Sequence, residues 1–324
     1  MRCFIRRHVF ITGLLASLSV CPAQAQKYPD RPIHVIIPYT AGGVADSIMR
    51  LVSVKMEEKL GQKLVIEARP GAAGNIGMLE VARAAPDGYT VLVAAANNFV
   101  INQFTMKMNV DPLEALTPVG KVADVPLVLF SNPAVPAKDF TEFLAYARRN
   151  PGKLNFGSPA AGTVNHLLLE RLKLEANIDM VHVPFRGSPQ GVMAVLANEI
   201  QLFTVGLSAG AEHLKENRLT ALAVATERRL PMLPEAGTLI EAGFPGFVAA
   251  NWWGMAVPKG TPEPIISTIY AALREALKDP VVVQRFTTMG ILVPHETREQ
   301  FAAGLASEAK IWSETVKRAN VVIE

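Results

Sequence analysis

Short apolar runs and longer amphipathic stretches alternate along most of the chain. The first pair is Ile33–Ile37, a β-branched run that predicts a buried strand, and residues 46–60, whose apolar positions repeat with helical spacing up to Gly61. The same alternation predicts strands over residues 64–66, 89–94, 122–130, 154–157, 182–185, 200–205 and 219–225. It predicts helices over residues 75–85, 140–149, 163–174, 191–197, 262–277, 279–289 and 297–320. Strands that alternate with helices are typical of βαβ units and of a parallel sheet covered on both faces.

Two stretches interrupt this alternation and divide the chain. Val125 lies in an apolar run with little helical pattern around it, and residues 247–257 have an extended pattern after Phe244-Pro245-Gly246. We expect the chain to cross between two α/β domains at these two places. Domain 1 then combines residues 26–124 and 248–324, and domain 2 comprises residues 125–247.

The first 25 residues have the pattern of an export signal. Three arginines precede the apolar run of residues 9–20, and residues 23–25 supply the small residues of a cleavage position. The run is too short for a bilayer helix, which needs ~20 apolar residues. We expect removal of residues 1–25, with cleavage after Gln26 as the second choice, and a periplasmic location. The export route stays open, although Arg6-Arg7 fits the twin-arginine pattern poorly.

Removal of this segment changes the charge of the chain. The full chain of 324 residues has 32 basic and 29 acidic residues, and this net charge of +3 alone suggests an anionic partner such as nucleic acid or a membrane surface. Three of the basic residues and no acidic residue lie within residues 1–25, so 29 of each sign remain. Both cysteines, Cys3 and Cys21, lie there too, which leaves the mature chain without a thiol. Val20 makes Cys21 a poor lipid anchor. We expect no nucleic-acid partner.

Glycine-rich loops follow several predicted strands where a helix begins. They cover residues 38–46, 69–77 and 157–163, and Asn97-Asn98 follow another strand. Glycine lets backbone N–H groups turn toward a ligand, and the start of a helix favours an anion. Each loop alone is also compatible with an ordinary turn. Because ligands of open α/β sheets bind at the carboxyl ends of strands, four such loops together predict a carboxylate site without lysine or arginine.

Other chemistries fit the sequence poorly. The glycines of residues 69–77 are spaced G-x-x-G-x-x-G, which differs from the dinucleotide pattern, and the sequence contains no Walker A loop and no G-x-S-x-G elbow. His166 and Glu170 have i,i+4 spacing, but one such pair is a weak metal signal, and we favour a capping or interface histidine. We therefore expect no catalytic residue, no metal and no cofactor.

Two further features stay open, and two histidines receive a structural interpretation. Arg186, at a strand end, is either a ligand contact or a surface arginine. Trp252-Trp253 form either an aromatic wall or a packing element at the domain crossing. His34 and His182 lie within predicted strands, and we expect both to be packed.

Ordered motifs over the whole mature chain resemble those of a known family. They occupy residues 28–33, 38–46, 69–77, 85–90, 157–167, 182–187, 222–226 and 241–246. In these motifs the chain resembles the substrate-binding proteins of tripartite tricarboxylate transporters, the TctC-like or Bug-type receptors. The resemblance implies a periplasmic binding protein-like α/β fold with two α/β domains, joined by a hinge of two crossing strands and closing around a small carboxylate. The family's ligand contacts then correspond to Tyr39, Thr40, Ala41, Gly42, Gly43, Asp46, Gly74, Asn75, Ile76, Ser158, Thr163, His166, Phe185, Arg186 and Gly187.

Two places depart from the family's pattern. Many members carry an acid, able to meet a ligand's amino group, where this chain has Val205. Burial of an ammonium group beside valine is costly, so we expect a ligand other than an amino acid. Asn97 and Asn98 stand where hydroxyl residues are common, which leaves the contacts of that loop open.

The resemblance therefore predicts a non-catalytic, monomeric receptor. It captures a small carboxylate-bearing metabolite and delivers it to the permease subunits of a tripartite tricarboxylate-type transporter. A sensor subunit that presents its ligand to a signalling protein is the alternative, and an exported enzyme on the same fold is the less favoured one. The sequence does not name the ligand.

Overall fold

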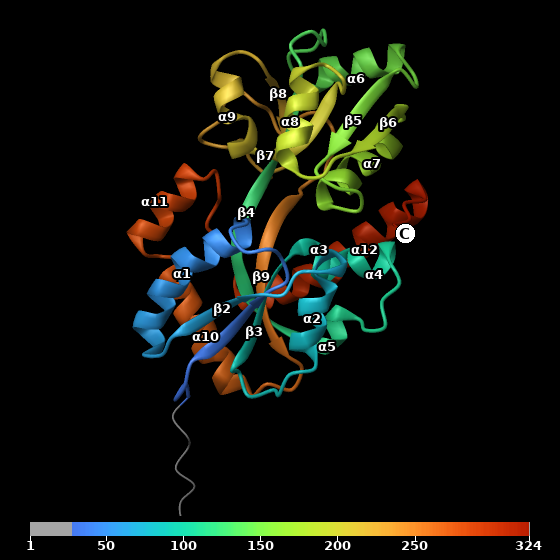
Figure 1. The fold of residues 1–324 in the computed structure, drawn as a ribbon. Helices are drawn as coiled ribbons and strands as arrows, with labels where there is room; N and C mark the ends of the chain where they lie inside the picture. Colours follow the sequence, from blue (N-terminus) through green and yellow to red (C-terminus); the bar gives the residue numbers. More distant parts are fainter. Residues whose placement is uncertain (1–27, 324) are drawn as a thin grey trace, which may run out of the picture.

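The computed structural model describes residues 28–323, and nine strands in this part of the chain connect in the order β2-β1-β3-β9-β4-β7-β5-β6, with β8 beside β4 (Figure 1). The strands are β1 (Ile33–Ile37), β2 (Leu64–Ala68), β3 (Thr90–Ala95), β4 (Leu116–Ser131), β5 (Leu154–Ser158), β6 (Met180–Pro184), β7 (Leu202–Gly206), β8 (Thr220–Val224) and β9 (Ala250–Pro258). The predictions for residues 1–25 lie outside the described residues.

Helices fill most of the connections. They are α1 (Val44–Leu60), α2 (Asn75–Ala82), α3 (Ala96–Val100), α4 (Asn102–Thr105), α5 (Pro112–Ala115), α6 (Phe140–Arg149), α7 (Val164–Ala176), α8 (Ser188–Leu196), α9 (Leu207–Lys215), α10 (Glu263–Ala276), α11 (Pro280–Thr288) and α12 (Arg298–Ala319), with a 3₁₀ turn η1 (Ala72–Gly74) before α2. Within residues 28–323, no helix combines the length and apolar character needed to cross a membrane.

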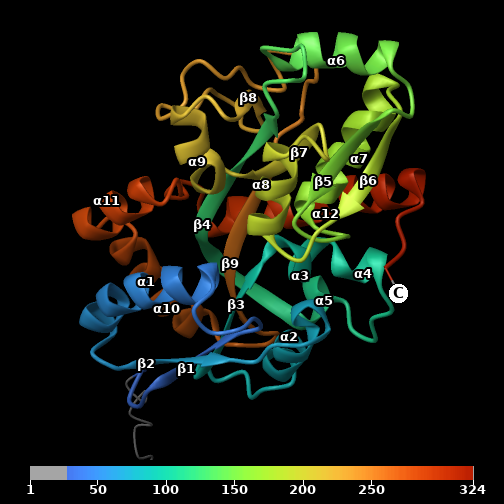
Figure 2. The same ribbon diagram turned by 45° about the horizontal axis from the view of Figure 1, so that its top comes forward.

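The lower domain in Figure 1, domain 1, is built on strands β1, β2, β3 and β9 and the first part of β4. Side chains alternate across β1, so that Ile33, Val35 and Ile37 belong to a core with α1 and α10, whereas Ile36 belongs to a core with α2, α3 and α12. Figures 1 and 2 show these helices on opposite sides of the sheet. Both faces of the sheet are therefore buried, as the continuous apolar strands predict.

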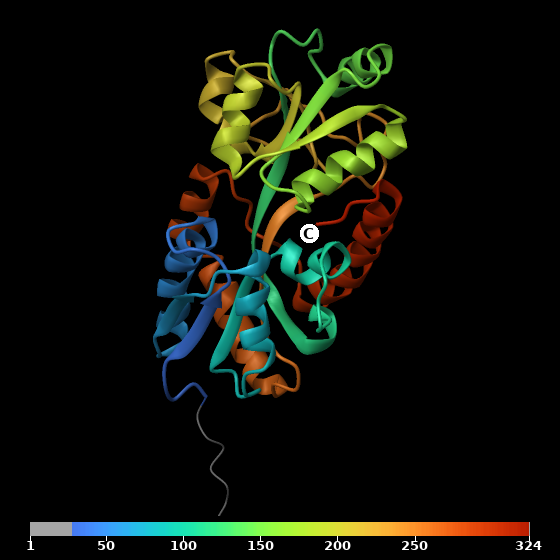
Figure 3. The same ribbon diagram turned by 45° about the vertical axis from the view of Figure 1, so that its right-hand side comes forward.

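The upper domain, domain 2, has β5 parallel to β6 and β7, and β4 antiparallel to β7 and β8. Two strands join the domains (Figures 1 and 3). The 16-residue β4 pairs with β9 from Leu116 to Pro126 and then with β7 and β8 from Leu127 onward. The predicted α/β fold with two crossing strands is confirmed. The residue-level boundaries at 124/125 and 247/248 stay a prediction.

Some local predictions are wrong. The sheet is mixed, because β9 enters domain 1 antiparallel to β3. Strand β4 begins six residues before its predicted start, since register shifts near Pro118 and after Lys121 accommodate residues that weaken the strand pattern. Helix α9 was not predicted because Gly210 interrupts its apolar pattern; in the structure this glycine lets Phe130 pack against the helix. His34 is exposed beside Glu67 instead of packed.

Candidate functional site

A cleft of about 560 Å³ lies between the two domains, beside the crossing strands. Strands β4 and β9 contribute Val125, Asn251 and Trp253, and the rest come from loops, helix starts and strand ends of both domains. The lining residues are Tyr39, Val44, Ala73, Ala95, Asn97, Asn102, Met106, Val125, Pro159, Ala160, Ala161, Gly162, Thr163, Asn165, Ser188, Val205, Gly206, Ser208, Ala209, Asn251, Trp253 and Ile323. This volume is in the usual range for a small-molecule site.

In the described part of the chain, six helices of five or more residues begin at this cleft, three from each domain, and the four-residue α4 also begins there, at Asn102. Domain 1 presents the starts of α1, α2 and α3, and domain 2 presents those of α7, α8 and α9. Lining residues that are at or next to these starts are Val44, Ala73, Ala95, Asn97, Gly162, Thr163, Ser188, Gly206 and Ser208. Unpaired N–H groups in a first helical turn favour an anion, so the cleft gathers such groups from both sides.

Most of these helix starts lack a side-chain cap. The N-cap residues of α1, α2, α8 and α9 are Gly43, Gly74, Gly187 and Gly206, and α3 begins after Ala95; none of the five makes a capping hydrogen bond. Helices α5, α6, α11 and α12, which begin elsewhere, all carry an Asp or Thr cap. At the cleft only α7 has one, from Thr163. The first N–H groups of α2 already donate to the Ala72 and Gly71 carbonyls, so the uncapped N–H groups of α1, α3, α8 and α9 are the ones available to a ligand.

The cleft is formally neutral. None of its lining residues within the described chain carries a charged side chain. Val205 is 4% exposed and lines it, so this strand end offers an ammonium group no partner. The Trp253 indole N–H is buried and has no hydrogen-bond partner in the described part of the chain. The polar groups of the described lining are therefore uncharged, and the Trp253 N–H is a donor that a ligand could use.

The loop between β1 and α1 is fixed by Asp46. Its Oδ2 accepts hydrogen bonds from the Gly42 N–H at 3.1 Å and from Arg50 Nε at 2.8 Å. The hydrogen bond from Arg50 lowers the pKa of the Asp46 carboxyl below its usual value. Asp46 therefore shapes the loop from outside the cleft lining, which Tyr39 and Val44 beside it form.

Three buried amide side chains hold the loop before α2. Asn98 and Asn102 each donate from Nδ2 to the Ala73 carbonyl at 3.1 Å, and Asn102 also donates to Asn75 Oδ1 at 2.8 Å. The Tyr39 hydroxyl donates to Asn98 Oδ1. Burial raises the pKa of Tyr39, so the phenol stays protonated and remains a donor. The cluster fixes Ala73 at the cleft wall.

Two stacked histidines hold the loop before α7. Their ring centroids are 3.6 Å apart, and His166 Nδ1 accepts a hydrogen bond from the Gly162 N–H at 3.1 Å. Ser158 Oγ donates to the Ala160 carbonyl at 2.9 Å, so its single hydrogen is used and it accepts from His182 Nε2 at 2.8 Å. These contacts position the loop.

The Ser158–His182 pair does not have the arrangement of a nucleophile and its base. Ser158 is fully buried, and its proton points to a carbonyl oxygen instead of the imidazole. Burial, with the His166 ring beside it, lowers the pKa of His182 to about 3. A base that must receive a proton near neutral pH has a higher pKa than this.

Asparagine contacts also join the cleft wall to the crossing strands. Asn165 Nδ2 donates to the Thr204 carbonyl at 2.7 Å, and Asn251 Nδ2 donates to Asn165 Oδ1 at 2.9 Å. Across the cleft, Asn97 Nδ2 of domain 1 donates to the Gly162 carbonyl of domain 2 at 3.2 Å. The two domains are therefore in direct polar contact at the cleft.

The structure separates the predicted site residues into three groups. Those that line the cleft are Tyr39, Asn97, Thr163 and Val205. Those that hold a lining residue or its loop, or belong to such a loop, are Thr40, Ala41, Gly42, Gly43, Asp46, Gly74, Asn75, Ile76, Asn98, Ser158, His166 and Gly187. The other two lie apart: Phe185 lines a separate surface hollow beside α8, and Arg186 has an exposed side chain.

Sequence reasoning missed several lining residues. Asn102, Asn165 and Asn251 were passed over because they sit within or beside predicted elements, away from the glycine loops. Ser188 and Ser208 each lie within two residues after a glycine at a helix start, a signal that could have identified them. Ile323 lies close to the end of the sequence, far from the glycine loops, and no motif around it indicates a role in the cleft.

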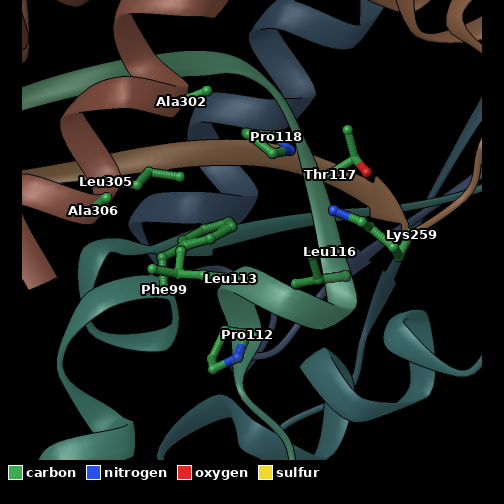
Figure 4. Close-up of a pocket in the computed structure, with 10 residues that line it drawn as sticks. All are labelled: Phe99, Pro112, Leu113, Leu116, Thr117, Pro118, Lys259, Ala302, Leu305 and Ala306. Carbon is green, nitrogen blue, oxygen red and sulfur yellow. The ribbon is translucent and has the colours of Figure 1, made fainter.

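A second cavity, of about 270 Å³, lies in domain 1 and has a different character. Figure 4 shows apolar side chains around it, with Lys259 as its charged group. Phe99, Leu116 and Leu305 in its wall also belong to the core. We attribute this cavity to imperfect packing beneath α12, because convergent polar groups are the usual mark of a ligand site.

Comparisons with known proteins point in one direction. The profile of the family described as "Tripartite tricarboxylate transporter family receptor" (TctC) matches residues 48–324. A solved structure described as a periplasmic transporter is 35% identical, with a TM-score of 0.77 and coverage of 92% of this chain and all of that one. MatC from Rhodopseudomonas palustris, solved with malate, is 30% identical, with a TM-score of 0.73 and coverage of 89% and 100%. An R. palustris protein solved with adipate is 28% identical, with a TM-score of 0.77 and coverage of 91% and 99%.

Proposed function

Because the chain belongs to the TctC family of tripartite tricarboxylate transporter receptors, we propose that it captures a small organic carboxylate in the cleft between its domains and delivers it to the permease subunits of such a transporter. The family comprises periplasmic solute-binding proteins, and the predicted periplasmic binding protein-like fold is confirmed. Export to the periplasm and the absence of catalysis are part of the proposal.

One observation supports this function most strongly. The cleft brings together six helix starts, of which five have no side-chain cap, and its described lining has no charged side chain. A carboxylate supplies the acceptors that these N–H groups lack, and each hydrogen bond to a charged group contributes about 1.5–3 kcal/mol. Three or four such bonds are enough for micromolar affinity without a basic side chain.

The proposed ligand carries a carboxylate and lacks an ammonium group. Two similar structures hold malate and adipate, which are carboxylates without an amino group. Val205 and the other uncharged lining residues give a buried ammonium group no counter-charge. We propose that the predicted loop at residues 39–43 contributes mainly backbone N–H groups, whereas the N–H groups of residues 74–76 and 185–187 already donate within the protein. The proposed side-chain donors are Asn97, Ser188, Ser208, Asn251 and Trp253, because the hydroxyl and amide hydrogens of Tyr39, Asn102 and Thr163 already donate within the protein.

A thermal-shift screen against small organic acids tests the proposal. A ligand that binds only the folded state at a concentration of 100 Kd stabilises it by about 2.7 kcal/mol. We expect at least one carboxylate to raise the melting temperature and the variant Asn97→Leu to weaken this shift. Asn109→Leu, at an exposed asparagine outside the cleft, is the matched control. If no organic acid shifts the melting temperature, the carboxylate receptor is the wrong function.

A further inference from the structure

The segment after α12 returns to the cleft. Asn320 ends the helix in the left-handed conformation, with φ of 52°, and the Val321 N–H donates to the Val316 carbonyl at 3.0 Å. Two residues later, the Ile323 N–H donates to the Thr105 carbonyl in α4 at 3.0 Å. Figure 3 shows this segment running from α12 toward the level at which the two domains meet. Its backbone is therefore anchored to domain 1 at two points.

The side chain of Ile323 reaches domain 2. It lines the cleft and packs so closely on Gly162 that a methyl group added to this glycine would lie 1.9 Å from Ile323 Cδ1. Gly162 has φ of 69°, so the loop already requires glycine at this place. The Ile323 side chain occupies the space that a side chain at position 162 would otherwise fill.

Gly162 is the point at which domain 1 touches this loop of domain 2. Its N–H donates to His166 Nδ1 within domain 2, and its carbonyl accepts from Asn97 Nδ2 of domain 1. Ile323 adds an apolar contact to the same residue from the same side. Asn97 and Ile323 both line the cleft, so whatever fills the cleft also meets the residues that join the domains.

We propose that Ile323 is a specificity-determining residue which forms an apolar end wall of the cleft and limits the length of the bound carboxylate. Met106, next to Thr105, and Ala161, next to Gly162, extend the apolar surface around it. The part of the ligand that faces this wall is then a short hydrocarbon group, since a second charge there would be buried against apolar side chains. This assignment rests on the proposed carboxylate-binding function.

Chain-length selectivity tests the assignment. The probes are sodium salts of straight-chain mono- and dicarboxylates of four to ten carbons, titrated calorimetrically into the wild type, Ile323→Ala and Val322→Ala. Val322 is 76% exposed and outside the cleft, which makes it the matched control. We expect Ile323→Ala to bind the acid preferred by the wild type at least fourfold more weakly, because a buried methylene contact is lost, and to shift the optimum by two or three carbons. An unchanged length profile in Ile323→Ala would overturn the assignment.

A second measurement needs no ligand and separates this inference from the proposed function. Without Ile323, hydrogen exchange of the backbone amides in residues 160–163 is expected to speed up at least threefold, and Val322→Ala is expected to leave it unchanged. Unchanged exchange in Ile323→Ala overturns the contact. A wild type that binds none of the acids overturns the carboxylate function. In that case the hydrogen-exchange experiment still tests whether Ile323 contacts Gly162.

Discussion

Trp252 and Trp253 are adjacent in the sequence and have different surroundings, because neighbouring side chains of a strand point to opposite faces. Trp252 is buried and donates from Nε1 to Glu308 Oε2 at 2.9 Å. Trp253 lines the cleft in an edge-to-face contact with Tyr39, with ring centroids 5.3 Å apart. Both alternatives that the sequence leaves open are therefore realised, one by each residue.

This difference predicts a fluorescence signal specific to Trp253. The chain has three tryptophans, and Trp252 and Trp312 are both 2% exposed in the core. We expect a bound carboxylate to change the emission through Trp253, so Trp253→Phe loses most of the change and Trp312→Phe keeps it. Steady-state titration measures both. A full signal in Trp253→Phe would show that the ligand lies away from this wall.

Val205 gives a second prediction for a single residue. In Val205→Asp, the new carboxylate faces a cleft without a basic side chain, so we expect carboxylate affinity to fall at least tenfold, or about 1.4 kcal/mol, through repulsion. Val205→Ala, which removes only packing, serves as the control. Calorimetric titration of both variants measures the difference. Equal affinity in Val205→Asp and Val205→Ala would place the carboxylate far from β7.

Helix starts are the elements that set the chemistry of the cleft. Four helices that begin elsewhere, such as α6 with Asp139, satisfy a first-turn N–H group with a side chain, whereas α1 begins after Gly43 without such a cap. A glycine in place of a capping side chain costs a few tenths of a kcal/mol of stability at each helix. The cleft helices therefore give up some stability, which bound ligand restores.

A side-chain cap on α1 should raise the stability of the fold and lower its affinity for a carboxylate. Gly43 has an extended backbone with φ of −76°, and a Cβ there meets only the Thr40 carbonyl oxygen, at 3.3 Å, so aspartate requires this loop to shift by a few tenths of an ångström. We expect Gly43→Asp to raise the free energy of unfolding by ~0.5–1 kcal/mol and to weaken carboxylate binding at least tenfold.

The matched variant is Asp139→Ala on α6, where the Asp139 side chain accepts from the Glu142 N–H at 2.9 Å. It should lose about 1 kcal/mol of stability and keep its ligand affinity. Urea unfolding and calorimetry measure the two quantities. A Gly43→Asp variant that binds as tightly as the wild type would exclude α1 from the site.

Elements with a clean period were predictable, and those shaped by distant contacts were not. The β1 run and the periodic α12 face are local patterns, and the glycines of the loops indicate turns by residue type alone. Helix α9 has its glycine beneath Phe130, and the loop before α7 depends on His182, sixteen residues beyond His166. Such features follow from packing between segments that are distant in the sequence, and the hydrophobic periodicity of one segment carries no information about that packing.

At the scale of the whole molecule, a partly buried charge cluster lies where β4, β9 and α12 meet. Lys121 Nζ lies 3.2 Å from Asp124 Oδ1 and 2.7 Å from Glu296 Oε1. Burial raises the pKa of Asp124, and the Lys121 ammonium opposes this rise. Burial also raises the pKa of Glu308, which accepts hydrogen bonds from two tryptophans. One ammonium group therefore stabilises several carboxylates beside the crossing strands.

Removal of that ammonium group should destabilise the protein in a pH-dependent way. We expect Lys121→Met to lose about 3 kcal/mol at pH 8, since buried carboxylates are left without their partner. A carboxyl group whose pKa is raised by folding loses stability as the pH rises through that pKa, so the loss should shrink at pH 5. Denaturant unfolding at both values tests this, with Lys55→Met at a surface ion pair as the control. A loss independent of pH would contradict the account.

The central claim is that uncapped helix N–H groups in a neutral cleft bind a carboxylate. The most direct test is a calorimetric titration with the tightest carboxylate from the screen and with its carboxamide, which has nearly the same shape and no charge. Hydrogen bonds to a charged acceptor exceed those to a neutral one by about 1–1.5 kcal/mol each, so the account predicts binding of the carboxamide about 100-fold weaker or worse. Equal affinity for the two compounds would contradict it.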